Sequence, residues 1–75
     1  MTSYNGHRSW NAWNVSLWLG SEENLYRMCV DVMEKYNRAG FVADLLVRFE
    51  LPAETPDGAQ YNRLSVKLFL ESLEE

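Results

Sequence analysis

Apolar residues recur at spacings of three and four between Ser21 and Arg38, which places them on one face of a helix. The residues of this stripe are Leu25, Met28, Cys29, Val32, Met33 and Tyr36. On the same segment, an acidic residue precedes a basic one by four positions in the pairs Glu23–Arg27, Asp31–Lys35 and Glu34–Arg38. Such pairs stabilise an exposed helix face by about 0.3 kcal/mol each. With Ser21 as N-cap and Gly40 as C-terminal stop, the pattern predicts an amphipathic helix.

The segment from Ser9 to Leu19 fits two periodicities. Alternation as in a strand is found at Trp13, Val15, Leu17 and Leu19, and a helical stripe at Trp10, Trp13, Leu17 and Trp18. Ser9 can cap a helix and Gly20 can end one, while a lone strand would have no evident partner in so short a chain. A helix is therefore favoured, and a strand at 13–19 would make the fold α+β.

Two further helices are predicted downstream. Helical spacing over 41–49 is set by Val42, Leu45, Leu46 and Phe49, with Asp44 four residues before Arg48. Pro52 then interrupts the pattern, because the residue before a proline is pushed out of helical geometry, and 51–54 reads as a linker loop. Thr55 as N-cap and Pro56 at the first helical position predict that the last helix begins there. Its apolar positions are Tyr61, Leu64, Leu68, Phe69 and Leu73.

Four helices with short connections predict an all-α fold, a small irregular four-helix bundle with the tryptophan-rich first helix across the second and fourth. We expect one domain over 1–75, with 1–8 as a flexible N-terminal segment. At 75 residues the chain is near the lower size limit for one hydrophobic core. Cys29 is the only cysteine, so no internal disulfide can form, and the aromatic residues are expected to supply most of the buried area.

The formal net charge of −4 disfavours direct binding to nucleic acid, because the summed field repels phosphate. The basic residues are also spread along the chain, without the clustering of a basic stripe. The N-terminal segment contains no apolar run of the signal-peptide type, and no stretch of eighteen apolar residues occurs. We therefore expect a cytoplasmic protein that makes no membrane contact.

The sequence lacks the side chains of a typical active site. His7 is the single histidine and lies in the turn-like Asn5-Gly6-His7 stretch, which favours an exposed loop residue over a general base. Cys29 lies on the apolar stripe, where a thiol is usually inert. The glycines are isolated, so they form no phosphate-binding loop. We expect no enzymatic activity, no catalytic residue, no metal and no cofactor.

Two features suggest a binding surface. Apolar residues surround the first helix, and its tryptophans either pack under the other helices or form a patch for a partner or a second copy. Acidic residues without a basic neighbour four positions on gather at 50–57 and at the C-terminus, where they either meet a basic partner or simply face water. The candidate partner-binding residues are Glu50, Glu54, Asp57, Glu71, Glu74, Trp18 and Tyr26.

The Tyr4-Asn5-Gly6 turn, the block Trp13-Asn14-Val15-Ser16-Leu17-Trp18-Leu19 and the polar break 20–23 before Tyr26 resemble an uncharacterised family of small phage- and mobile-element-encoded proteins. The resemblance covers about the first third of the chain. It implies a mobile-element accessory protein, and such proteins are often small acidic inhibitors of host defence. The expected function is thus a non-enzymatic inhibitor of anti-CRISPR or antirestriction type. Its partner would be a host protein or nucleoprotein defence complex in the host cytoplasm.

A second hypothesis is a homodimeric structural or regulatory accessory protein that associates through the tryptophan-rich helix. The two hypotheses differ in the partner that the apolar surface meets, which is a host complex in the first and another copy of the chain in the second.

Overall fold

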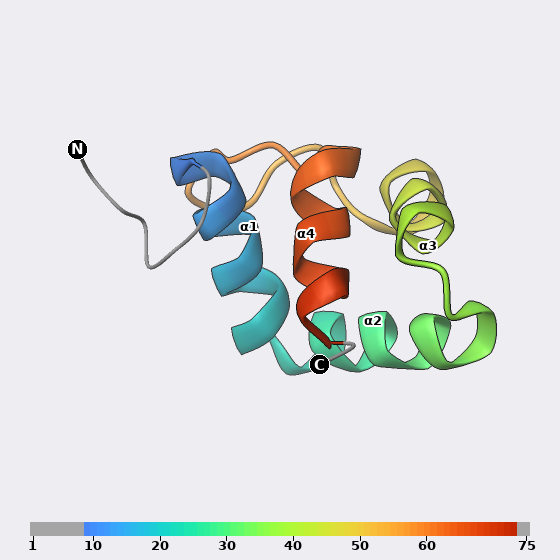
Figure 1. Ribbon diagram of the computed structural model, residues 1–75. Coiled ribbons are helices and arrows are strands. Elements are labelled where there is room, and N and C mark those ends of the chain that lie inside the picture. The colour runs from blue at the N-terminus through green and yellow to red at the C-terminus, as the bar shows by residue number, and fades with distance from the viewer. Residues whose placement is uncertain (1–8, 74–75) are drawn as a thin grey trace.

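The computed structural model describes residues 9–73, and every regular element in this range is a helix. The elements are α1 (Trp10–Ser21), α2 (Glu23–Tyr36), α3 (Ala39–Leu45), the π-helical turn η1 (Leu46–Glu50) and α4 (Arg63–Leu73). Figure 1 shows α4 in the middle, between α1 and α3, with α2 crossing below them. The protein is compact and all-α, with four helices packed together, which confirms the predicted fold class. The N-terminal segment 1–8, which includes His7, and Glu74 lie outside the described residues.

Helix α1 begins as predicted, but a different face of it is buried. The Ser9 side chain caps the helix by accepting a hydrogen bond from the Ala12 N–H at 3.2 Å. The helix continues one residue past Gly20. Its buried side chains are Ala12, Asn14, Val15 and Leu19, whereas the predicted stripe lies toward the edges, with Trp10 and Leu17 exposed and Trp13 and Trp18 half-buried. The smaller side chains face the core because α1 packs along both α4 and α2.

Helix α2 is shorter than predicted at both ends. It starts after Glu22, whose carboxylate accepts a hydrogen bond from the Asn24 N–H at 3.2 Å. It ends at Asn37, which adopts the left-handed conformation with φ 52° and donates its N–H to the Met33 carbonyl at 2.7 Å. Asparagine tolerates this conformation, so it serves as the helix stop that was expected at Gly40. Gly40 instead lies within α3.

Two of the four predicted helix-face ion pairs form. Among residues 9–73, pairs within 4 Å join Glu23 to Arg27 at 2.7 Å, Asp44 to Arg48 at 3.1 Å and Lys67 to Glu71 at 3.5 Å. The expected pair between Glu34 and Arg38 is absent because Arg38 lies beyond the end of α2. The expected Asp31–Lys35 pair is also absent, and the Lys35 ammonium lies 5.7 Å from the centroid of the Tyr36 ring. All three pairs are solvent-exposed and contribute little to stability.

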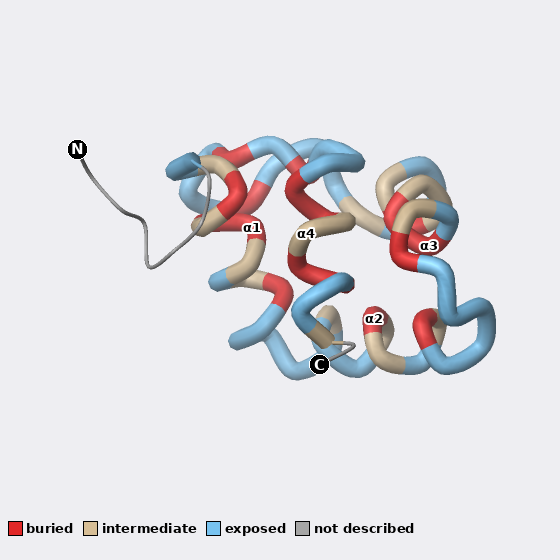
Figure 2. Tube along the Cα trace, viewed as in Figure 1, coloured by how far each residue is buried: buried red, intermediate tan, exposed pale blue. Residues whose placement is uncertain are grey.

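The core is mainly aliphatic, which corrects the expectation that aromatic rings supply most of it. Figure 2 shows the buried positions on the inward sides of the helices. Its largest fully buried apolar side chains are Val15, Leu19, Val42, Leu46, Val66 and Leu70. Within residues 9–73, Tyr61 and Phe69 are the buried aromatic residues. Among the remaining rings of residues 9–73, Trp13 and Trp18 are half-buried, and the others are exposed.

The predicted helix over 41–49 starts earlier and widens at its end. The Leu51 N–H donates to the Leu46 carbonyl at 2.8 Å, a bond that spans five residues and defines the π-helical turn. Each residue in such a turn advances less around the axis than in an α-helix, so the predicted stripe loses its register. Leu46 is buried, but Phe49, which was predicted on the same face, is 73% exposed.

The last helix begins at Arg63 and not at Thr55. Residues 55–58 form a tight turn, in which the Gly58 N–H donates to the Thr55 carbonyl at 2.9 Å and the Thr55 N–H donates to the Ala59 carbonyl at 2.7 Å. Gly58 has φ +94°, a conformation that ends a turn of this kind and that a side chain would strain. Thr-Pro-Asp suits both a helix start and a turn, and the glycine decides for the turn.

The buried face of α4 follows from its later start. Asn62 caps the helix, since its side-chain oxygen accepts a hydrogen bond from the Ser65 N–H at 2.9 Å. The buried residues are Ser65, Val66, Phe69 and Leu70, whereas Leu64 of the predicted stripe is 50% exposed. Tyr61, which the sequence pattern predicts within the helix, is buried but belongs to the preceding loop.

One buried amide joins α1 to this loop. Asn14 is 1% exposed, and its side-chain oxygen accepts a hydrogen bond from the Thr55 hydroxyl at 2.6 Å. Its side-chain nitrogen donates to the Asp57 carboxylate at 2.9 Å, and the Trp18 indole N–H donates to the same carboxylate oxygen at 3.0 Å. The Thr55 hydroxyl in turn accepts the Ala59 N–H at 3.0 Å. The amide, which would be costly to bury alone, is thereby satisfied on both sides.

Asn11, one turn before Asn14, extends this attachment. Its side-chain oxygen accepts the Gln60 N–H at 2.7 Å, and its side-chain nitrogen donates to the Gln60 carbonyl and to the Ser65 hydroxyl, each at 2.9 Å. The Asn11 amide therefore pairs with the loop backbone much as a neighbouring strand would. Residues 11, 14 and 18 lie on one face of α1, and together they hold the loop against it.

Replacing Asn14 by alanine should destabilise the fold by about 3 kcal/mol, because the Thr55 hydroxyl loses its acceptor and the Asp57 carboxylate loses a donor. Urea or thermal unfolding followed by circular dichroism measures this change. Asn24→Ala is the matched control, since Asn24 is exposed and its side chain makes no hydrogen bond within residues 9–73. Equal stability of the two variants would contradict the role given to Asn14.

The stability should also fall in acid through Asp57. Hydrogen bonds from Asn14 and then Trp18 lower the pKa of the Asp57 carboxyl, so the ionised form stabilises the fold above the unfolded value of about 3.9. That stabilisation is lost as the pH falls through the lower, folded-state pKa. Between about pH 6 and pH 2, the melting temperature of Asp57→Asn should therefore fall less steeply than that of the unmodified protein. Asp31→Asn, on the exposed face of α2, should keep the steeper dependence.

Candidate functional site

A cleft of about 450 Å³ opens where the loop 51–62 meets α1 and the start of α2. Trp18, Leu25, Pro52, Pro56 and Tyr61 supply its apolar surface. Glu22, Asn24, Glu54 and Thr55 supply its polar surface. Three separate parts of the chain build the cleft, and the hydrogen bonds of Asn14 and Trp18 to the loop hold two of them together. We call it the acidic cleft.

The apolar surface of the acidic cleft is fixed before any ligand arrives. The Trp18 ring is oriented by its hydrogen bond to Asp57, and Pro52 and Pro56 have little backbone freedom. Tyr61 is buried, and burial raises the pKa of its phenol, with the Cys29 thiol and the Glu22 carboxylate adding to the rise. Groups already held in place lose little entropy on binding, so such a surface favours affinity.

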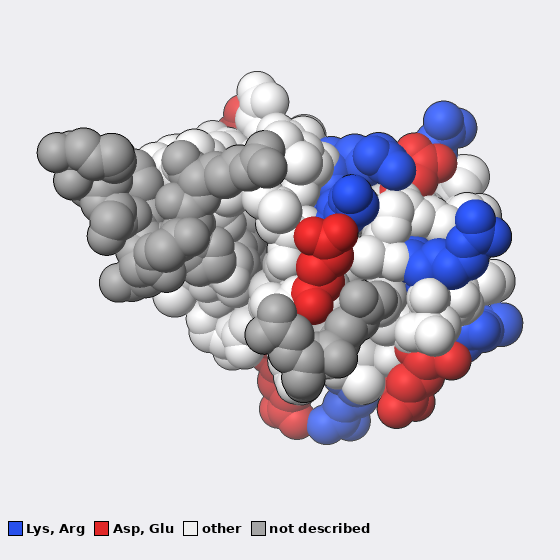
Figure 3. Space-filling model, viewed as in Figure 1, with Lys and Arg blue, Asp and Glu red and all other residues white. Residues whose placement is uncertain are grey.

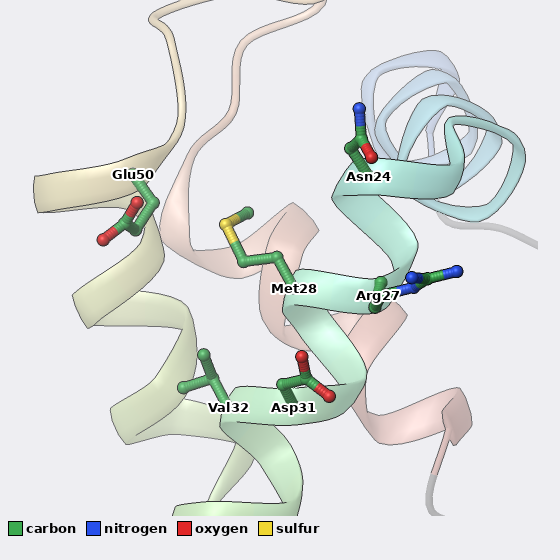
Figure 4. A pocket seen from close by; sticks show the side chains of 6 residues that line it. All are labelled: Asn24, Arg27, Met28, Asp31, Val32 and Glu50. Atoms are coloured by element: carbon green, nitrogen blue, oxygen red, sulfur yellow. The ribbon is translucent and has the colours of Figure 1, made fainter.

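A second, shallower hollow continues from the cleft along α2. Asn24 belongs to both, and the other lining residues of the hollow are Arg27, Met28, Asp31, Val32 and Glu50. Figure 4 shows Met28 pointing from α2 toward the helix that carries Glu50, while Arg27 points away from this gap. Arg27 is paired with Glu23, so the hollow presents the carboxylates of Asp31 and Glu50 beside an apolar Met28.

The carboxylates of the cleft and of the hollow have no ion-pair partner in the described part of the chain. Within residues 9–73, no basic side chain lies within 4 Å of the carboxylates of Glu22, Asp31, Glu50 or Glu54. Arg63 and Lys67 lie elsewhere, against the start of α3 at Gly40. Figure 3 shows basic and acidic side chains interspersed on the face in view. The cleft and the hollow together carry these four carboxylates beside an apolar floor, and we call them the acidic strip.

The structure brings some of the predicted partner-binding residues together. Trp18 and Glu54 line the acidic cleft, and Glu50 lines the adjoining hollow. Asp57 accepts the hydrogen bond of Trp18, so it supports the cleft from behind the ring. Tyr26 is exposed and lines a different depression near the end of α4, together with Leu73. Glu71 is paired with Lys67 on α4 and lies apart from the strip.

The described residues offer little for acid–base or metal chemistry. Cys29 is fully buried in the core, and desolvation raises the pKa of its thiol to about 12, which leaves it protonated and unreactive. Residues 9–73 contain no group of three histidine, cysteine, aspartate or glutamate side chains placed to hold a metal ion. No helix in the same range is both long and apolar enough to cross a bilayer.

Sequence reasoning missed several residues of the site. Leu25 and Tyr61 were assigned to the core, and Pro52 and Pro56 were interpreted as a linker and a helix start. A signal was present in Asn11 and Asn14, two amides spaced by three on a helix that is otherwise largely apolar. Polar residues on a buried face require partners, so they indicate that a polar segment packs there. The pattern does not say which segment that is.

Comparison with known proteins identifies a family for this chain but assigns it no activity. A search of curated proteins and a search of solved structures each found no match to this chain. The profile of one family, described as a family of unknown function, matches residues 1–74. The match spans nearly the whole sequence, including both sides of the acidic cleft, and the chain therefore belongs to the family of unknown function DUF7249.

Proposed function

We propose that this protein is a non-enzymatic binding module that receives a basic, partly apolar segment of a partner protein in the acidic cleft. The observation that carries the proposal is the combination of a pre-arranged apolar surface with the rim carboxylates of Glu22 and Glu54, which have no basic neighbour within residues 9–73. An apolar floor supplies affinity, and the unpaired rim charges select a partner of opposite sign.

The chemistry of the cleft defines the segment that it would bind. An aliphatic or aromatic side chain of the partner would pack on Trp18 and Pro56, while an arginine or lysine would reach Glu54 at the rim. The hollow along α2 would extend the same recognition, since Glu50 and Asp31 flank Met28 there. A segment that alternates basic and apolar residues fits both parts of the strip.

The finer proposal is that the partner belongs to a host defence complex and that the protein acts as an inhibitor of anti-CRISPR or antirestriction type. Two considerations support it. The first is the resemblance of the N-terminal third to proteins of phages and mobile elements. The second is the acidic strip, which would compete with nucleic acid for a basic surface on a nuclease. In this mechanism the inhibitor occludes the surface and performs no chemistry.

Peptide binding tests the cleft. We expect short fluorescein-labelled peptides that combine arginine, lysine and leucine to bind, with an affinity that falls as salt increases. Glu54→Lys should weaken this binding about tenfold, since it places a like charge beside the peptide. Glu34→Lys makes the same charge change on α2, outside the cleft, and should alter the affinity less than about twofold. Fluorescence anisotropy measures both, and equal losses would reject the cleft as the binding site.

Phage plaquing tests the finer proposal. Expression of the unmodified protein should restore plaques on a host protected by a CRISPR or restriction nuclease, and should change nothing on the same host without that nuclease. Glu54→Lys should lose the restoration, whereas Glu34→Lys should keep it. If peptides bind but no defence system is inhibited, the binding function stands and the host-defence assignment is rejected.

A further inference from the structure

A second surface, at the other end of α2, carries exposed aromatic residues that the proposed binding function does not use. Tyr36 and Phe41 contact each other edge to face, with ring centroids 5.1 Å apart and planes at 70°. Both rings are exposed, and Phe49 on η1 is 73% exposed. We call Tyr36, Phe41 and Phe49 the aromatic face. Large exposed rings gathered in this way are typical of protein contacts.

An apolar groove lies beside Phe49 on the same surface. It has a volume of about 340 Å³ and runs between the second half of α2 and η1. Its apolar walls include Val32, Tyr36, Leu45 and Leu46, and Phe49 forms one edge. The wider π-helical turn is the reason for this arrangement, because it directs Phe49 outward while Leu46 stays in the core. One surface therefore carries both a protruding ring and a groove that could accept such a ring.

The charges of the groove also have both signs. Lys35 lines it from α2 and Glu50 lines it from the end of η1, and the two are not paired with each other. The neighbouring cation Arg48 is already bound to Asp44. Glu50 also belongs to the hollow of the acidic strip, whereas Lys35 lines only the groove among these depressions. This surface therefore carries the elements that a two-fold symmetric contact requires, namely a knob with a groove and a cation with an anion.

We propose that the aromatic face is the interface of a two-fold symmetric homodimer, in which Phe49 of each copy enters the groove between α2 and η1 of the other. The same rotation brings Lys35 of one copy toward Glu50 of the second copy, twice in the dimer. The acidic cleft shares no lining residue with this groove and stays open in the dimer, whereas the adjoining hollow shares Val32 and Glu50 with the groove and is partly covered. The dimer therefore presents two clefts to a partner.

The expected dimer is small and reversible. Each aromatic side chain can bury about 150 to 250 Å², and a standard stable interface takes about 800 Å² from each partner. Three rings that are already partly covered fall short of that area, so we expect a dimer that dissociates on dilution, with a dissociation constant in the micromolar range or above.

Sedimentation equilibrium over a range of protein concentrations tests the proposal. The average mass of the unmodified protein should rise from monomer to dimer, whereas Phe49→Asp should remain monomeric at every concentration. Because Phe49 is exposed, this variant should keep its helical circular dichroism spectrum. Leu17→Asp introduces the same charge at an exposed apolar position of α1 and should still dimerise.

Charge exchange supplies an independent readout. Lys35→Glu and Glu50→Lys should each weaken the dimer, because each places like charges together across the two-fold axis, and the double variant should regain most of the affinity. A protein that stays monomeric at all concentrations overturns the proposal. A dimer that persists in Phe49→Asp also overturns it. If that dimer is lost in Leu17→Asp, the interface belongs to α1.

Discussion

The buried amide of Asn14 is the constraint on which the rest of this structure depends. An amide in the middle of a packed helix face cannot be left without partners, and the turn at Thr55 and Asp57 is what satisfies it. The turn must therefore lie against α1. The position of α4 follows, because only a short segment connects the turn to α4. In a chain without a disulfide, this polar contact gives the fold a specific arrangement that aliphatic packing alone would specify less sharply.

The same contact produces the surface on which binding is proposed. Trp18 and Asp57 are 39 positions apart in the sequence, and their hydrogen bond places the indole ring beside Pro56. Membership in DUF7249 names no activity, so function has to be argued from such surfaces. The acidic cleft and the aromatic face lie near opposite ends of α2, which lets one small molecule offer two distinct contacts.

Much of the fold was predictable because helix-forming patterns are local. The stripe of α2 and the Ser9 cap of α1 gave two helices close to their observed bounds. The errors occur where two local signals compete. Thr55-Pro56-Asp57 suits a helix start and a turn alike, and Asn37 ended α2 before Gly40 could. Phe49 left its stripe because a π-helical turn depends on packing. The acidic cleft joins residues distant in sequence, and periodicity gives no information about which of them meet.

The attachment of α1 to residues 55–60 also determines when the acidic cleft can form during synthesis. The side chains of Asn11 and Asn14 lie near one end of the chain, and their partners are 41 to 54 positions away. During synthesis the first two helices therefore emerge from the ribosome before the loop that satisfies them exists, and the amides remain hydrated until then. The acidic cleft can form only after residues 51–62 have been added to the chain. A chain that stops before residue 51 lacks Pro52, Pro56 and Tyr61, and therefore has no such cleft.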